Sequence, residues 1–229
     1  MAPDDVKTEI RRKRIHYTGL IVPIAYWFLS KMVLLGFVGA SFMGFIIIDY
    51  MRLRKKNSLV SSFFTDDNKV ASIRLKPIAG IGGGTEIKRD VTIPALNPLL
   101  RKEERTSIGA HTFFALGCFI SIALFSKNIA IAAIAALVVG DSAAAILGKK
   151  YGKKRIYGKK TEVGTLACLL SSFMICIMFV PIEVAACGAA AAALTELFSG
   201  KLFNDNATIP IISGGAMTVA EHVFGALPL

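Results

Sequence analysis

Long apolar runs alternate along the chain with short, strongly basic segments. About 20 apolar residues are needed for a helix to cross the hydrocarbon core of a bilayer. Seven runs reach or approach that length: residues 15–31, 32–50, 108–126, 129–147, 163–181, 182–199 and 207–227. We expect each run to be a transmembrane helix. The pattern therefore predicts an all-α, multi-pass membrane protein in which residues 1–229 form a single membrane domain.

The longest polar segment, residues 51–107, separates the second and third predicted spans. Residues 72–76 and 86–93 alternate loosely between apolar and polar side chains, and a glycine-rich stretch, residues 80–84, lies between them. Such alternation around glycines is typical of a β-hairpin. The segment is thus predicted to be a cytoplasmic insertion that contains a small hairpin.

Composition and charge agree with the membrane interpretation. Apolar residues make up 54% and charged residues 19% of the chain, whereas soluble domains average 45–50% and about 25%. With the N-terminus in the cytoplasm, 25 of the 27 lysine and arginine residues fall on the cytoplasmic side, and only Lys31 and Lys127 do not. Cytoplasmic loops accumulate these residues. We therefore predict a cytoplasmic N-terminus, and the net charge of +11 requires no nucleic-acid partner.

Several polar residues lie within predicted spans, close to their cytoplasmic ends. Asp141 is about 10 Å deep at 1.5 Å per helical residue, Glu196 is about one turn from the inner end of its span, and Asp205 and Asn206 open the last span. An ionisable residue in a bilayer is costly and indicates a functional site. Because these residues come from different spans at a common depth, we expect a polar pocket at the cytoplasmic face.

A basic segment, residues 149–160, flanks this expected pocket with seven positive charges. Alone, it could bind anionic lipid headgroups or nucleotide phosphates. Carboxylates beside it are natural Mg²⁺ ligands, and Mg²⁺ is a partner of phosphate. The combination favours phosphoryl or nucleotidyl transfer on a lipid. Glu9, Arg12, Lys13 and His16 lie on one face of an N-terminal helix, and their spacing by itself predicts an interfacial anchor.

The ordered set of these features resembles the CTP-dependent lipid kinases, which include dolichol kinase, phytol kinase and CTP-dependent diacylglycerol kinase. The resemblance extends from about Glu9 to Pro210 and is interrupted over residues 57–97. The matching pieces are Glu9-x-x-Arg12-Lys13-x-x-His16, Leu100-Arg101-Lys102-Glu103-Glu104, Gly140-Asp141-x-x-Ala144, Gly148, Gly152, Lys160-Thr161, Gly164-Thr165, Glu196 and Asp205-Asn206-x-x-Ile209-Pro210. One departure is that Glu162 stands one position earlier than the family glutamate.

The resemblance implies transfer of the γ-phosphoryl group of CTP to the hydroxyl of a membrane lipid alcohol, with Mg²⁺ or another divalent cation, at the cytoplasmic face. It implies catalytic roles for Asp141, Glu196 and His16, and metal binding by Asp141, Asp205 and Asn206. The residues it implies for nucleotide and phosphate binding are Arg12, Lys13, Gly148, Lys149, Gly152, Lys153, Lys160, Thr161 and Glu162. The lipid stays open among polyprenol, dolichol, phytol-like, diacylglycerol and ether-lipid alcohols.

Two other functions fit the membrane setting. A phosphatidate cytidylyltransferase also uses CTP, but its Lys-Asp…His-Gly-Gly…Asp-Arg signature is missing from the chain. A non-enzymatic lipid carrier or flippase would account for the spans. Transporters usually place their buried charges near the middle of the membrane, whereas the charges here gather near one face.

Overall fold

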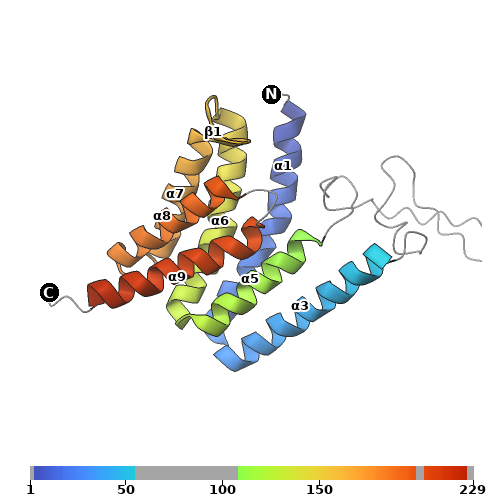
Figure 1. Ribbon diagram of the computed structural model, residues 1–229, viewed down its shortest axis with the longest axis vertical. Coiled ribbons are helices and arrows are strands. Elements are labelled where there is room, and N and C mark those ends of the chain that lie inside the picture. Colours follow the sequence, from blue (N-terminus) through green and yellow to red (C-terminus); the bar gives the residue numbers. More distant parts are fainter. Residues whose placement is uncertain (1–2, 55–107, 200–203, 226–229) are drawn as a thin grey trace, which may run out of the picture. The chain divides into compact units, whose positions relative to one another are not determined.

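The computed structural model describes residues 3–54, 108–199 and 204–225, and these are almost entirely helical (Figure 1). The helices are α1 (Pro3–His16), the 3-10 helix η1 (Tyr17–Leu20), α2 (Ile21–Phe28), α3 (Lys31–Arg54), α5 (Ala110–Leu124), α6 (Lys127–Tyr151), α7 (Glu162–Cys176), α8 (Ile182–Phe198) and α9 (Asp205–Gly225). The prediction of a mainly helical protein is confirmed. The remainder of the predicted insertion over 51–107, beyond the end of α3, lies outside the described residues, as does its predicted hairpin.

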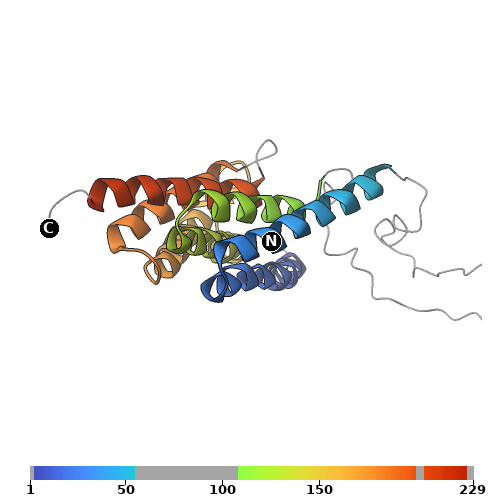
Figure 2. The same ribbon diagram turned by 90° about the horizontal axis from the view of Figure 1, so that it is seen from below.

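The described residues divide into two units. One contains residues up to 47 together with those from 108 onward, and it holds almost everything described below. Within it α6 is the central helix, because α1, α2, α5, α7, α8 and α9 all pack against it. Figure 2 shows α5 and α9 lying side by side. Of the second unit, only the last turns of α3 are described, and they are helical.

The first predicted span, residues 15–31, is not one continuous helix. Helix α1 reaches His16 at the start of this stretch, then η1 follows, and α2 ends at Phe28. Pro23 lies in α2 and has no N–H to donate to the carbonyl of Gly19, as an unbroken α-helix would require. The missing hydrogen bond favours a change of helix type at this point.

Two of the described helices are long and apolar enough to cross a bilayer by length and composition, α3 over Lys31–Met51 and α6. Helices α5 and α7 are apolar but shorter. The apolar stretch of α6 is 78% buried by the surrounding helices, whereas that of α3 is 17% buried. These helices support the prediction of a membrane protein. The number of seven spans and their orientation remain predictions.

The centre of the bundle is packed with small side chains. Ala132, Ala133 and Ala136 of α6 are fully buried, and small residues let helix backbones approach closely in a membrane. Large apolar side chains face outward instead, among them Phe28 and Phe37, which are 81% and 67% exposed. An extensive exposed apolar surface is typical of contact with lipid or a partner.

The basic segment begins in the last turn of α6 and continues into a β-hairpin that was not predicted. Strand β1 (Arg155–Tyr157) pairs antiparallel with β2 (Lys160–Thr161), so that Arg155 faces Thr161 and Tyr157 faces Lys160. Gly158 in the turn has a φ of 54°, which a residue without a Cβ adopts most readily. Because the side chains of β1 are all exposed, the strands lack the apolar alternation by which a hairpin is recognised in sequence.

Candidate functional site

Asp141 of α6 is contacted by two side chains of α1. Lys13 forms an ion pair with Asp141 Oδ2, and His16 Nε2 lies 3.6 Å from the same oxygen. Lys13 and Asp141 are both buried, with exposed fractions of 3% and 7%. Lys13 and His16 are three positions apart and thus share a helix face. The structure therefore brings two predicted site residues of α1 to a third, Asp141, that is far from them in the chain.

Glu9 makes a second connection between α1 and α6. Its Oε1 lies 2.5 Å from the Arg12 guanidinium, and its Oε2 accepts a hydrogen bond of 2.7 Å from Lys149 Nζ. Burial alone would raise the pKa of Glu9, but the Lys149 hydrogen bond and the nearby charges of Arg12, Lys149 and Lys13 outweigh it and hold the pKa below its ordinary value. Glu9 was not among the predicted site residues, although its spacing from Arg12, Lys13 and His16 was a signal.

Glu196, near the end of α8, is 3% exposed and pairs with the hairpin. Its Oε1 accepts a hydrogen bond of 2.5 Å from Lys160 Nζ of β2. Its Oε2 is buried and has no hydrogen-bond partner in the part of the chain that the structure describes. Glu196 also interacts electrostatically with Asp141 and Asp205. Carboxylates from α6, α8 and α9 therefore share one polar region, as the sequence predicted.

These contacts define one group of side chains, which we call the polar cluster. Its members come from α1, α6, β2 and α8. They are Glu9, Arg12, Lys13, His16, Asp141, Lys149, Lys160 and Glu196.

Asn204 organises the start of α9, and it was not among the predicted site residues. Its Oδ1 accepts hydrogen bonds from the backbone N–H and the side-chain Nδ2 of Asn206, both at 3.1 Å. Its carbonyl oxygen accepts the N–H of Ala207 at 3.0 Å. Asn204 is thus the N-cap of the helix. Asn206 is buried one position inside α9, next to Asp205.

The predicted metal ligands are Asp141, Asp205 and Asn206. Within the described ranges, no three His, Cys, Asp or Glu side chains lie close enough to hold a metal ion by themselves. Asp141 and Glu196 are each paired with a lysine instead. Magnesium commonly binds one or two carboxylates and completes its shell with phosphate and water. A cation bound by these side chains would therefore need further oxygen ligands, such as water or phosphate.

Three residues predicted to bind phosphate have a packing role in this structure. The Thr161 hydroxyl caps α7 by accepting a hydrogen bond of 3.2 Å from the Gly164 N–H. A Cβ on Gly148 would lie 2.9 Å from Thr161 Oγ1 and 3.2 Å from Gly164 Cα, and a Cβ on Gly152 would also meet Thr161. Glycine at these positions lets the end of α6 lie against the start of α7.

Two further residues predicted to bind phosphate, Lys153 and Glu162, lie on the surface. Lys153 is exposed. Glu162 Oε1 lies 2.7 Å from Lys154 Nζ, and the glutamate side chain is 49% exposed. The hydrogen bond and the charge of Glu162 raise the pKa of Lys154. Glu162 thus forms its ion pair at the surface, with a lysine that is not part of the polar cluster.

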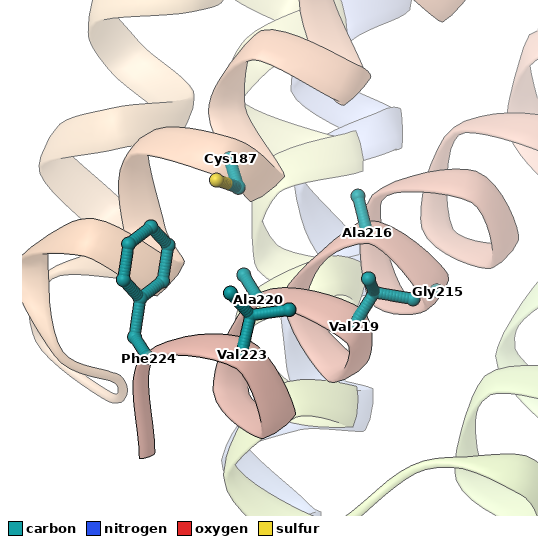
Figure 3. A pocket seen from close by; sticks show the side chains of 7 residues that line it. All are labelled: Cys187, Gly215, Ala216, Val219, Ala220, Val223 and Phe224. Carbon is teal, nitrogen blue, oxygen red and sulfur yellow. The ribbon is translucent and has the colours of Figure 1, made fainter. Parts of the chain in front are cut away.

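An apolar groove of about 440 Å³ lies between α8 and α9 (Figure 3). It is lined by Cys187, Gly215, Ala216, Val219, Ala220, Val223 and Phe224. Cys187 precedes Glu196 by nine residues, or about 13 Å along α8 at 1.5 Å per residue. The groove and the cluster therefore lie at different levels of the same helix.

The chain was compared with known proteins, and no family model and no solved structure matches it. It is 27% identical over 236 residues to the uncharacterized protein RP860 of Rickettsia prowazekii (strain Madrid E), an alignment covering 97% of this chain and all of that protein.

Two kinases are similar over shorter stretches. The chain is 45% identical over 51 residues to the dolichol kinase of Saccharomyces cerevisiae, covering 22% of this chain and 10% of the kinase. It is 34% identical over 125 residues to the phytol kinase of Synechocystis sp. (strain ATCC 27184 / PCC 6803 / Kazusa), covering 46% of this chain and 53% of that kinase. The chain thus matches about a tenth of one kinase and about half of the other. These partial similarities support a relationship to lipid kinases.

Proposed function

We propose that the protein transfers the γ-phosphoryl group of CTP to the hydroxyl group of a membrane lipid alcohol at the cytoplasmic face. The observation that carries this proposal is the polar cluster. It combines three buried carboxylates, Glu9, Asp141 and Glu196, with several cations inside an otherwise apolar helical bundle. The partial similarity to dolichol kinase and phytol kinase favours an alcohol as the acceptor.

Phosphoryl transfer depends mainly on positioning the reactants and neutralising charge. In the structure, Lys13 and Lys160 are each paired with a buried carboxylate. The phosphates of an entering nucleotide would compete for the same ammonium groups. Each lysine would then exchange a carboxylate for a phosphate, which keeps its charge compensated and releases Asp141 and Glu196 for other partners.

Glu196 is well placed to act as the general base. Its Oε2 is buried without a hydrogen-bond partner among the described residues, and a carboxylate oxygen accepts a hydrogen bond readily. The lipid hydroxyl would donate its proton to Oε2 while the hydroxyl oxygen attacks the γ-phosphorus and CDP leaves. His16, 3.6 Å from Asp141, is the alternative base.

A divalent cation such as Mg²⁺ would be held by side-chain oxygens of Asp141, Asp205 and Asn206 together with the nucleotide phosphates. When bound, it would supply neutralisation of the phosphate charge. Arg12 and Lys149, at the outer edge of the polar cluster, would bind further phosphate oxygens, because their side chains are 24% and 30% exposed.

The direct test is product analysis with protein purified in detergent, Mg²⁺, mixed lipid alcohols, phosphatidate and γ-labelled CTP. Label in the lipid fraction supports the kinase, and the labelled species identifies the acceptor. Labelled pyrophosphate with formation of a CDP-lipid would show a cytidylyltransferase instead. Absence of nucleotide binding would favour the lipid carrier.

Glu196→Gln tests the role of the base. Glutamine can still accept a hydrogen bond from Lys160 but cannot take up a proton, so we expect turnover to fall by about 10²- to 10⁴-fold. Glu183→Gln is the matched control, because Glu183 is exposed in the first turn of the same helix. Equal activities of the two variants would remove Glu196 from the mechanism.

A further inference from the structure

Glu9 is a buried carboxylate beneath two cations from different helices. Arg12 lies one turn further along α1, and Lys149 belongs to the last turn of α6. The Glu9 side chain is 6% exposed, while those of Arg12 and Lys149 are 24% and 30% exposed. The anion is thus covered by protein, and the two cations reach the surface above it.

The negative charge of Glu9 lets the positive charges of Arg12 and Lys149 lie close together. Two cations on neighbouring helices repel each other, and the charge of Glu9, which pairs with both, offsets part of this repulsion. A guanidinium has five N–H donors in a fixed fork, and Glu9 Oε1 occupies the NH2 group of Arg12. The remaining donors of Arg12, beside a second cation, fit an anion with several oxygens, such as a phosphate.

The same carboxylate also fixes where α1 lies. Glu9 and Lys13 are four residues apart on one face of α1, while Asp141 and Lys149 are eight residues, or about two turns, apart on α6. The pairs Glu9–Lys149 and Lys13–Asp141 therefore attach the two helices at two levels. Loss of the Glu9–Lys149 pair would leave α1 held to α6 at one level.

We infer that Glu9 is a positioning residue for nucleotide binding. It holds Arg12 and Lys149 together as a phosphate-binding pair, while the separate Lys13–Asp141 pair keeps α1 attached to α6. Glu9 itself contacts no substrate. This inference rests on the proposed function, because it names the group that organises the nucleotide side of that site.

Kinetics of Glu9→Gln test the inference, with CTP varied at fixed lipid and lipid varied at fixed CTP. The KM for CTP should rise by roughly tenfold or more, because a charged hydrogen-bonding partner is lost. The kcat and the KM for lipid should change by less than about threefold. A purely structural role predicts the opposite: a lower kcat and a smaller folded fraction, with the KM for CTP unchanged.

Glu9→Asp and a double-mutant cycle make the test independent of folding. Aspartate keeps the charge on a shorter side chain, so its KM for CTP should lie between those of wild type and Glu9→Gln. Lys149→Met should also raise this KM, and adding it to Glu9→Gln should cost less than the two separate effects combined, because both remove one interaction. Strictly additive effects would overturn the inference.

Binding of a CTP analogue with a methylene group between its β- and γ-phosphorus atoms, measured by calorimetry in detergent, separates the two proposals. Weaker binding to Glu9→Gln than to wild type supports the role of Glu9 whether or not phosphoryl transfer occurs. Unchanged binding and KM in an active enzyme would overturn the Glu9 inference alone. A wild-type protein that neither binds the analogue nor turns over CTP would overturn the proposed function and the inference with it.

Discussion

Helix α8 contributes to two regions that are built in different ways. Near its end, Glu196 is buried against Lys160 within the polar cluster. Nearer its start, Cys187 borders the apolar groove, whose other lining residues come from α9 (Figure 3). One region is held by charges in specific pairs, and the other by the shapes of small and apolar side chains.

Single substitutions should therefore have larger effects in the polar cluster than in the groove. Ion pairs in the polar cluster join residues far apart in the chain: Lys13 with Asp141 and Glu9 with Lys149. Removal of Asp141 leaves the buried ammonium of Lys13 without its anionic partner, at a cost of several kcal/mol. In the groove, an added or lost methyl group changes packing alone and leaves every charge in place. The polar cluster should therefore be the sensitive region for both activity and folding.

Asp141→Asn should produce the largest effect. Turnover should fall by roughly a thousandfold or more, because a charge at the reacting groups is lost. The change also leaves the buried ammonium of Lys13 without its anionic partner, so thermal stability in detergent should fall as well. Labelled-CTP assays and melting curves on the same preparation measure the two effects together.

The double variant Lys13→Met with Asp141→Asn separates these two effects. Methionine removes the stranded charge and keeps much of the volume, so much of the lost stability should return. Activity should not return. Wild-type turnover by either variant would exclude Asp141 from the mechanism.

Much of this architecture could be predicted from the chain alone. Six of the seven apolar runs correspond to helices close to their predicted bounds, since burial from water or in lipid imposes a length that can be counted, whereas the first run is divided among three helices. The shared depth of Asp141 and Glu196 correctly placed them in one polar region. The spacing of Lys13 and His16 placed both on one face, and both reach Asp141.

Pairing between distant residues could not be predicted in the same way. Nothing local shows that Lys149 faces Glu9, because that contact depends on how α1 packs against α6. The roles of Gly148 and Thr161 likewise depend on helix packing, which leaves no periodic signal in either segment. The fold thus follows from local patterns, whereas the partners within the site follow from tertiary contacts.

Gly148→Ala and Gly215→Ala compare packing in the two regions. A Cβ on Gly148 would press on Thr161 Oγ1 and Gly164 Cα, disturbing the cap of α7. We expect a loss of about 1–2 kcal/mol in stability. A Cβ on Gly215, in the groove, would meet nothing within 4 Å. That variant should be neutral or more stable by up to about 1 kcal/mol. Thermal melts in detergent measure the stability of both variants. Equal losses of stability would contradict the expected difference between the two regions.

The dependence of stability on pH tests how much the charge of Glu9 contributes to folding. Folding lowers the pKa of Glu9 below its ordinary value of 4.5. Its carboxylate therefore stabilises the folded state above the unfolded pKa, and this contribution is lost as the pH falls through the lower folded value. The difference in melting temperature between wild type and Glu9→Gln should be largest near neutral pH and shrink below about pH 4.5. A difference that is constant with pH would show that the charge of Glu9 is not the source of its effect.

Glu162→Gln should have the smallest effect of all. Glu162 is half exposed and pairs with Lys154 at the surface, where solvent and salt screen the interaction. We therefore expect turnover within about threefold of wild type and little change in melting temperature. Glu196→Gln, which removes a buried carboxylate of the polar cluster, is the positive control in the same assay. A loss from Glu162→Gln as large as that from Glu196→Gln would show that Glu162 performs the role of the family glutamate from its shifted position, and that the reacting groups extend to the start of α7.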